Sequence, residues 1–427
     1  MDERWDVAVV GGGLSGALAS LAAAREGRKT LLIEKYGFLG GAAVAALVNP
    51  FMHYRTASRR INNAGLFQTL LDRLDSMGAL HANRTTFNEQ LLCIALDDLL
   101  REAGVQVLLH AQLRAVHCAQ EANGTRISEL LLQGLSGQEH KIVSSIFVDA
   151  TGDGDLIALS GAPFQIGRDS DHACQPMTLC LRIGGIDMQK LEDAARSSGF
   201  SSYQAFMNDV FRQAKADGDL AIPREDILSF PTMLPGVMHF NTTRVLGKNS
   251  LSSESFTEAE QEGRRQAYAF YRFLRGRIPG FEGCVLLQLA PQTGVRESRR
   301  FVGKYVLRGE DVIACRKFKS GIARACYGVD IHNPNGEGTQ RQRMTGDAYH
   351  TIPMECLYSD AYQNLVVTGR PISSDHTAHS AIRVMPICAS LGEAAGILAA
   401  QGAPASDVRR VAYADVQRVL AQHGGVY

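Results

Sequence analysis

The sequence carries no net charge and has no long apolar run, and both absences exclude classes of protein. Its 427 residues hold 44 basic and 44 acidic side chains, so no long-range field draws the chain to nucleic acid or an anionic membrane, and neither is expected as a partner. No apolar run approaches the roughly 18 residues that a membrane-spanning helix needs. The chain starts with MDERWDVAVV, acidic where a signal peptide is basic, which favours a cytoplasmic protein.

The cysteine and histidine patterns exclude further classes. The nine cysteines never occur as CxxC, and no histidine and cysteine set has metal-ligand spacing on one element, so we expect reduced, buried thiols and no metal site. The sequence also lacks the nucleophile elbow of serine or cysteine hydrolases. Its 427 residues exceed the usual limit of one core, about 250 to 300, so two domains are expected.

A glycine-rich turn lies near the start of the chain, after an apolar run at residues 5–10. In GGGLSG, the residues Gly11, Gly13 and Gly16 have the spacing GxGxxG. The first glycine permits a tight turn, the second lets the backbone approach a pyrophosphate, and the third lets the next helix pack against its strand. The helix predicted over LSGALASLAAARE points its free N–H groups at that phosphate.

A second predicted strand, residues 30–33, leads into Glu34. An acidic residue there accepts hydrogen bonds from ribose hydroxyls and disfavours a 2′-phosphate, which argues against NADP. Because strand, glycines, helix, second strand and acid occur in the right order, a purely structural glycine loop is the weaker interpretation. The motif alone does not separate NAD from FAD.

The segment GFLGGAAVAALVNP adds a second glycine pair, Gly40 and Gly41. With it, the sequence resembles the FAD-dependent oxidoreductases of the glutathione-reductase-like superfamily, in which this segment runs beside the pyrophosphate and ribityl chain. Relatives often carry Thr or Ser after the pair, whereas this chain has Ala42, so no hydroxyl contact is expected there. The resemblance implies FAD as cofactor and an α/β fold: a Rossmann-like FAD-binding domain, with a parallel sheet and helices on its faces, and an inserted α+β cap or substrate domain.

Three later segments match the cofactor site of this superfamily. Residues 104–118 would lay a strand beside the adenine, VSSIFVDATGDGDL would pass under the cofactor, and NLVVTGRP would turn at the pyrophosphate and ribityl chain. In the second segment, Asp153 and Asp155 fit an Asx turn and helix cap as well as a direct role. Pro386 suits the first position of the final helix, whose small residues permit close packing and whose start favours a reduced, anionic flavin. The resemblance assigns cofactor contacts to Gly11, Gly13, Leu14, Ser15, Gly16, Glu34, Lys35, Gly40, Gly41, Ala42, Leu113, Ala150, Thr151, Gly152, Gly369, Arg370 and Pro386.

Four further segments, GRPISSDHTAHSAIRVMP, GVRESRRFVGKYVL, HFNTTRV and DIHNP, resemble one branch of FAD-dependent oxidoreductases and extend the resemblance over nearly the whole chain. We predict an FAD-binding domain made of residues 1–163 and 350–427, with a cap or substrate domain at 164–349. No second GxGxxG occurs in that middle part, so the separate NAD(P) module of glutathione-reductase-type enzymes is missing.

The candidate catalytic residues lie in these four segments. A flavin oxidoreductase needs an acid or base near the moving proton and cations that orient an anionic or carbonyl substrate. If residues 376–383 are helical, their spacing places two histidines and an arginine on one face. We predict catalytic roles for His376, His379, Arg296, Arg383 and Arg244, and consider Asn241, Arg300 and His332 as further candidates.

Each candidate also has a structural interpretation. Arg296 and Arg300 flank Glu297, so an internal ion pair explains RESRR equally well. A histidine is often a core residue, and His332 fits a turn between Asp and Pro. His53 could carry a covalent flavin, but nothing in VNPFMHYR demands it.

These patterns favour a dehydrogenase or reductase in which FAD exchanges a hydride with a small organic substrate under the cap. A flavin monooxygenase is one alternative, although its typical Gly-Asp turn is Gly369-Arg370 here. A flavin-holding electron-transfer subunit is another, against which the many His and Arg residues of the middle part argue. The sequence leaves open the substrate, the electron donor or acceptor, covalent attachment of the flavin and assembly into a homo-oligomer.

Overall fold

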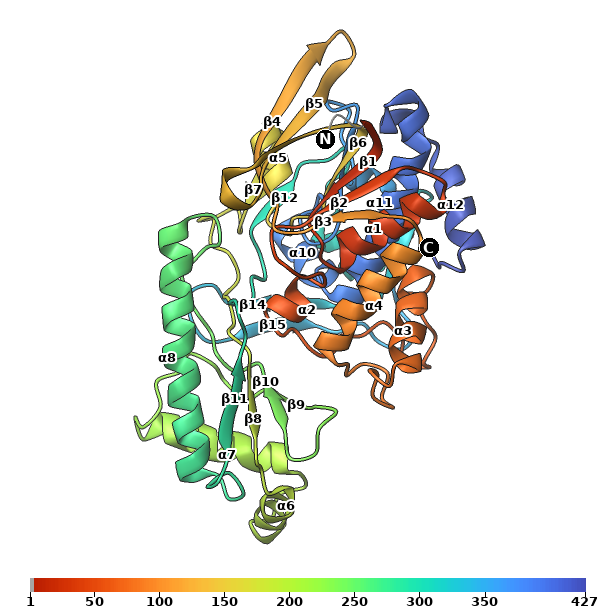
Figure 1. Ribbon diagram of the computed structural model, residues 1–427. Helices are drawn as coiled ribbons and strands as arrows, with labels where there is room; N and C mark the ends of the chain where they lie inside the picture. The colour runs from red at the N-terminus through yellow and green to blue at the C-terminus, as the bar shows by residue number, and fades with distance from the viewer. Residues whose placement is uncertain (1–3) are drawn as a thin grey trace.

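The apolar run near the start of the chain forms the middle of a seven-stranded sheet (Figure 1). The computed structural model describes residues 4–427, so residues 1–3, where the predicted first domain begins, lie outside the described part. β1 (Arg4–Val10) pairs in parallel with β2 (Thr30–Ile33) and β6 (Glu139–Asp149). β3 (Gln106–Leu108) extends the sheet beyond β2, and β17 (Leu365–Val367) pairs with β6, again in parallel. β2 and β17 are fully buried apolar runs, as expected for parallel strands covered on both faces.

The single strand predicted at residues 104–118 is in fact two strands. β3 joins the parallel sheet, whereas β4 (Gln112–Glu121) forms a hairpin with β5 (Gly124–Gln133). The break lies at His110, whose φ of 55° is incompatible with a continuous strand. β5 pairs with the first residues of β6, and the hairpin projects from one end of the molecule (Figure 1).

Two apolar helices, α1 (Leu14–Arg25) and α11 (Met385–Gly402), pack against each other beside the sheet. A Cβ added at Gly392 would lie 2.2 Å from the carbonyl oxygen of Ser15, so this close approach requires glycine. The small-residue face predicted for the final helix is therefore confirmed. The surrounding helices are α3 (Leu66–Ser76), α4 (Glu89–Glu102) and α12 (Tyr413–Gln422), and the short helices are α2 (Ala42–Ala45), α5 (Asp155–Ser160), α9 (Gly309–Ile313) and α10 (His376–Ile382).

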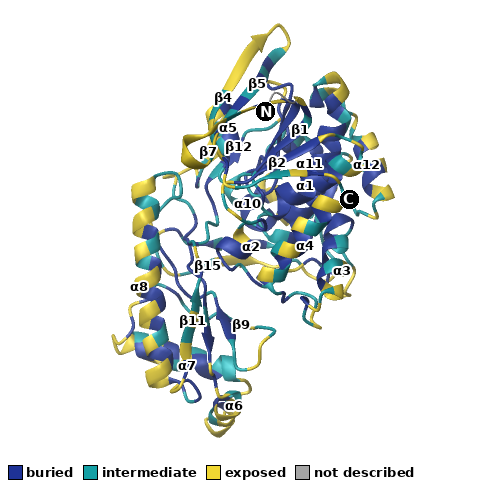
Figure 2. Cartoon of the chain, viewed as in Figure 1, coloured by how far each residue is buried: buried dark blue, intermediate teal, exposed yellow. Residues whose placement is uncertain are grey.

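A second lobe has its own sheet and its own core. Its antiparallel strands follow the order β11 (Val285–Leu289), β8 (Leu181–Gly184), β10 (Met238–Phe240) and β9 (Ser229–Pro231). The helices are α6 (Met188–Ser197), α7 (Tyr203–Ala216) and α8 (Ser253–Arg277), and Figure 2 shows α8 with one buried and one exposed face. Phe270 packs edge-on against Phe240 and Phe211 in this core, which extends from Leu179 to Ala290 and also includes Leu47.

Three two-stranded ribbons complete the fold: β7 (Phe164–Ile166) with β12 (Arg299–Phe301), β13 (Gly321–Ala325) with β16 (His350–Pro353), and β14 (Val329–His332) with β15 (Thr339–Gln342). Leu307, Ile322 and Val329 belong to the core formed around α1 and α11, although they fall within the predicted insertion at 164–349. The difference arises because β13 pairs with β16, which returns this part of the chain to the first domain. We propose that the core of the inserted domain ends near Ala290.

The architecture is thus an α/β, Rossmann-type domain with a separate α+β lobe, which confirms the predicted fold class. Among residues 4–427, no single helix is both long enough and apolar enough to span a membrane. The helix α10 and the stretch that begins with α11 reach that length and apolarity only when taken together, and they are bent by 94° relative to each other.

Candidate functional site

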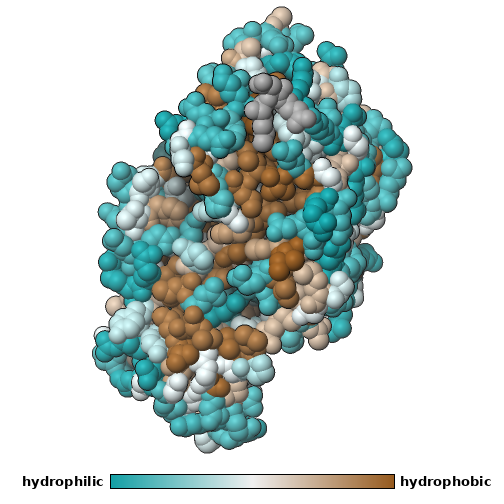
Figure 3. Space-filling model, viewed as in Figure 1, coloured by the Kyte–Doolittle hydropathy of each residue, from teal (hydrophilic) through white to brown (hydrophobic). Residues whose placement is uncertain are grey.

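A cavity of about 1100 Å³ lies between the carboxyl ends of the parallel strands and the second lobe. Small-molecule sites usually measure about 300 to 1,000 Å³, so this one has room for a dinucleotide and a small substrate. On the face seen in Figure 3, apolar side chains gather where the two lobes meet. We call the part lined by residues 10–15, 33–36 and 150–152 the nucleotide end, and the part lined by Arg224, Asn241, Arg296, Asp330, His332, Arg341 and Arg383 the polar end.

The three motif glycines at the nucleotide end have separate structural reasons. Gly11 has a φ of 106°, and a Cβ there would lie 2.3 Å from the carbonyl oxygen of Ala150. A Cβ on Gly16 would lie 1.8 Å from the carbonyl oxygen of Gly11, and such a side chain would block the close approach of α1 to its strand. A Cβ on Gly13 would have Gly41 Cα, at 3.8 Å, as its nearest neighbour. The side of Gly13 that faces the cavity is therefore open.

Gly13 is also the N-cap of α1, and it has no side chain with which to cap the first amide groups. These N–H groups lie at the wall of the cavity, where Leu14 and Ser15 line it, and form the positive end of the helix dipole. The arrangement is suited to hold a pyrophosphate.

The second glycine pair touches the first turn. Gly40 forms a parallel bridge with Gly13, and a Cβ on Gly41 would lie 2.8 Å from Gly13 Cα. Both glycines and Ala42 line the cavity, so the loop forms its wall beside the start of α1. As expected from the sequence, Ala42 offers no hydroxyl group here.

The turn after β6 is fixed by the buried carboxylate of Asp149. This side chain accepts hydrogen bonds from the backbone N–H of Thr151 at 3.0 Å and of Ile157 at 2.8 Å. Asp153 pairs with Arg370 at 2.8 Å, and Asp155 pairs with Arg299 at 3.1 Å. Asp153 and Asp155 are thus held by arginines, while Asp149 binds the turn and the Ile157 amide of α5.

The start of α11 forms another part of the wall. Val384, Met385 and Cys388 line the cavity, and Pro386 is the second rather than the first residue of the helix. Burial raises the pKa of Cys388 to about 12, so this thiol stays protonated at neutral pH. Pro386 itself is not among the residues that line the cavity, and it lies in the first turn of α11, so its contact with the cofactor stays a prediction.

The structure brings most of the predicted cofactor residues to one cavity. Besides Pro386, only Gly16 is outside the lining, because it serves the packing of α1. The predicted residues that line the cavity are Gly11, Gly13, Leu14, Ser15, Glu34, Lys35, Gly40, Gly41, Ala42, Leu113, Ala150, Thr151, Gly152, Gly369 and Arg370.

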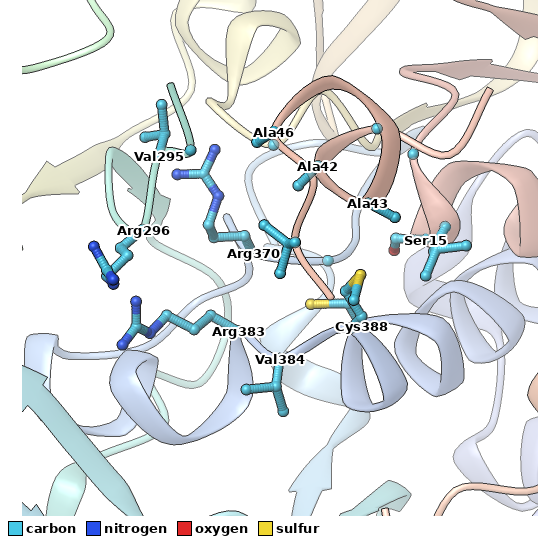
Figure 4. Close-up of a pocket in the computed structure, with 18 of the residues that line it drawn as sticks. Ser15, Ala42, Ala43, Ala46, Val295, Arg296, Arg370, Arg383, Val384 and Cys388 are labelled. Atoms are coloured by element: carbon cyan, nitrogen blue, oxygen red, sulfur yellow. The ribbon is translucent and has the colours of Figure 1, made fainter. Parts of the chain in front are cut away.

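Two of the predicted catalytic residues, Arg296 and Arg383, line the polar end. Figure 4 shows their side chains reaching one end of the cavity, with Ser15 and Cys388 at the other end of the view. Burial, followed by repulsion from Arg383 and Arg224, lowers the pKa of Arg296 well below its ordinary value. The guanidinium groups are therefore close enough for their charges to interact.

The other three predicted catalytic residues do not line the cavity. His379 is fully buried, and burial and nearby arginines lower its pKa far below the ordinary range. His376 is bound through Nδ1 to Glu297 Oε1 at 2.9 Å. Arg244 is buried in the second lobe, where it donates to His332 Nδ1 at 3.0 Å and to Thr339 at 3.1 Å. Helical spacing predicted that these histidines share a helix, but it could not show that neither of them lines the cavity.

Of the two arginines that flank Glu297 in RESRR, only Arg300 forms the ion pair with it among the described residues. Arg300 is fully buried and pairs with Glu297, which also holds His376. Arg296 instead donates to the carbonyl oxygen of Pro176 and to Asn241 Oδ1 at 3.5 Å. The run therefore supplies one structural arginine and one that lines the cavity.

Sequence reasoning missed the other groups of the polar end. Asp330 accepts hydrogen bonds from Tyr327 at 2.9 Å and Arg341 at 3.1 Å. Burial opposes its ionisation, but the hydrogen bond from His332 and the charge of Arg383 hold its pKa well below the usual range. Arg224 and His53 also line the cavity. The segment DIHNP indicated His332 as a candidate, but no local pattern indicated Tyr327 or Arg224.

The glycine turns, Glu34 and the start of α1 define a dinucleotide-binding protein of the Rossmann type. Its sequence matches the FAD dependent oxidoreductase family over residues 6–420, and the chain belongs to that family. The protein is therefore an FAD-dependent oxidoreductase. The nucleotide end fits FAD, with an open glycine face for the pyrophosphate and a carboxylate for the ribose.

Comparison with curated proteins gives no match. The structure is similar, at low identity, to a geranylgeranyl bacteriochlorophyll reductase-like protein from Thermoplasma acidophilum (13% identity, 98% of this chain and 84% of that chain, TM-score 0.47). It is also similar to the flavin-dependent brominase Bmp2 (14%, 97% and 83%, TM-score 0.47) and to p-nitrophenol 4-monooxygenase PnpA from Pseudomonas putida DLL-E4 (10%, 98% and 82%, TM-score 0.45).

Proposed function

We propose that the protein transfers a hydride between FAD and a small organic substrate that binds at the polar end of the cavity. The observation that carries this proposal is the continuity of one cavity, which joins the nucleotide motifs to a set of charged side chains under the second lobe. A subunit that only held flavin for electron transfer would have no use for such an enclosed polar end. When bound, FAD supplies the hydride acceptor or donor.

Arg296 and Arg383 orient the substrate in this proposal. They reach the cavity from different elements, the loop before β12 and the end of α10, so together they fix a substrate group from two sides. Such positioning lowers the entropic barrier of the reaction.

We further propose His53 as the group that moves the proton, in place of His376 and His379. Of the two histidines that line the cavity, His332 has Nδ1 engaged by Arg244 and Nε2 3.4 Å from the Asp330 carboxylate. Burial lowers the pKa of His332 to about 2, so it stays neutral and is a weak base. His53 is exposed to the cavity, with its ring centroid 6.0 Å from that of Tyr327.

The test is an absorbance spectrum of the purified protein, followed by anaerobic titration with NADH, NADPH and a panel of small organic substrates. We expect flavin bands that a substrate or a nicotinamide bleaches without oxygen, together with formation of the oxidised or reduced product. Flavin that is bleached only by NADPH, followed by oxygen uptake and hydroxylation of a substrate, would replace this proposal with a monooxygenase. Flavin that exchanges electrons with a protein partner but with no small molecule would replace it with an electron-transfer subunit.

A further inference from the structure

We propose that the polar end binds the carboxylate group of a small organic acid, with Arg224, Arg296 and Arg383 as its ligands. This inference rests on the proposed function and names the substrate class for the same cavity. Arg224 was absent from the residues that the sequence indicated, but it lines the same cavity as the two predicted arginines.

The three arginines come from separate parts of the chain and meet at one cavity. Arg224 lies in the loop after α7, Arg296 between β11 and β12, and Arg383 at the end of α10. The positive charges of these guanidinium groups repel one another. Burial, followed by repulsion from Arg383 and Arg224, lowers the pKa of Arg296. Burial and then repulsion from Arg244 likewise lower the pKa of Arg224 to about 10.

Among residues 4–427, no hydrogen bond joins the side chain of Arg224 or Arg296 to a carboxylate. Arg224 is only 4% exposed, yet within the described part of the chain its Nη1 has no hydrogen-bond partner. Arg296 donates only to the neutral oxygens of Pro176 and Asn241 among the contacts of the described residues. A buried guanidinium without an anion is costly, so an incoming anion would gain more here than at the protein surface.

Two carboxylates lie near these arginines, and both are already engaged. Asp330 Oδ2 is 3.8 Å from Arg383, but it also accepts from Tyr327, while its other oxygen accepts from Arg341. Glu225, which follows Arg224, pairs with Arg244 at 3.3 Å. The cationic groups of the polar end therefore outnumber the carboxylates that face them.

A carboxylate suits this site by shape as well as by charge. Guanidinium groups bind carboxylates through two parallel hydrogen bonds in one plane. Leu228, Phe230 and Met344 line the cavity together with the arginines and would contact the hydrocarbon body of an organic acid. These apolar neighbours favour an organic acid over inorganic phosphate.

The experiment compares acids with their uncharged amides on the FAD-loaded protein. Phenylacetate and hexanoate are titrated beside phenylacetamide and hexanamide, with binding followed by the flavin difference spectrum and by calorimetry. We expect the acids to bind about 10- to 100-fold more tightly than the amides. The variant Arg224→Gln should remove most of this preference with an unchanged flavin content, whereas Arg265→Gln, on the exposed face of α8, should leave it intact.

Each result decides between clear alternatives. Equal binding of acids and amides by FAD-loaded wild type would overturn the carboxylate site and leave the proposed function standing, and this comparison does not depend on the folding of any variant. Tighter binding of inorganic phosphate than of either acid would also overturn it. A protein that prefers the acids but exchanges no electrons between flavin and any small molecule would keep the site and overturn the proposed function.

Discussion

Glu34 and Gly12 are joined by a hydrogen bond of 2.6 Å, in which the Gly12 N–H donates to Glu34 Oε2. The other carboxylate oxygen accepts the N–H of Tyr36 at 2.8 Å. A carboxylate offers about four lone-pair sites, so two remain for ribose hydroxyls. Glu34 therefore holds the glycine turn in place and also presents an acceptor to the cofactor.

Removal of this carboxylate should weaken FAD binding. We expect Glu34→Ala to raise the Kd of FAD by about 10- to 100-fold, because hydrogen bonds to a charged group contribute about 1.5 to 3 kcal/mol. Fluorescence titration of the apoprotein with FAD measures the effect. Glu139→Ala, at an exposed position at the start of β6, is the control. Unchanged FAD affinity in Glu34→Ala would show that the cofactor does not contact this residue.

Two alanine substitutions in the glycine turn should affect different properties, one the binding of FAD and the other the folding of the protein. Gly13→Ala fits the backbone, whose φ is −65°, and its nearest neighbour would be 3.8 Å away, so the fold should survive while the methyl group obstructs the dinucleotide. Gly16→Ala would place Cβ 1.8 Å from the Gly11 carbonyl oxygen and should impair folding. Thermal unfolding and flavin content of the two purified variants separate these effects. A flavin-loaded Gly13→Ala protein would contradict the assignment.

The contrast between the two ends of the cavity shows what the sequence could predict. The nucleotide end was predictable because its glycines and Glu34 lie in one short segment with fixed spacing and order. The polar end is assembled from Arg224, Asp330 and Arg383, which are far apart in sequence, so no local spacing could show that they meet. Even for His379 the predicted helix was correct, but spacing alone does not tell which neighbour a helical face will contact.

His53 and His376 test the revised assignment of the proton-moving group. We expect His53→Gln to lower kcat about 100-fold, as for loss of a general acid or base, with flavin content unchanged. His376→Gln should affect stability more than kcat, because it removes the partner of Glu297. Steady-state kinetics across pH on both variants make the comparison. A wild-type rate in His53→Gln, or a selective loss of kcat in His376→Gln, would reverse the assignment.

Arg244 should act on stability rather than on the reaction. Its side chain is buried and donates to Glu225, His332, Thr339 and the backbone of the β14–β15 turn. Arg244→Met should therefore lower the free energy of unfolding by about 2 to 4 kcal/mol, since it leaves several acceptors unpaired. Urea unfolding measures this loss. If the variant keeps its stability and loses only kcat, then Arg244 has a direct role after all.

The pair formed by His423 and Glu393 should make stability depend on pH. The Glu393 carboxylate, whose Oε1 lies 3.4 Å from His423 Nδ1, raises the pKa of His423 together with Glu26, although burial opposes this. A raised histidine pKa means that the stabilisation is fully present below the unfolded value of about 6.5 and is lost as pH rises through the folded value.

His423→Gln should therefore destabilise the protein at pH 6, by about 1 kcal/mol or less, and have a smaller effect at pH 9. Urea unfolding at several pH values, with each variant compared with wild type, gives the difference directly. His117→Gln, at an exposed position of β4, should show no such trend. A destabilisation by His423→Gln that stays constant or grows between pH 6 and pH 9 would mean that its contribution is packing rather than charge.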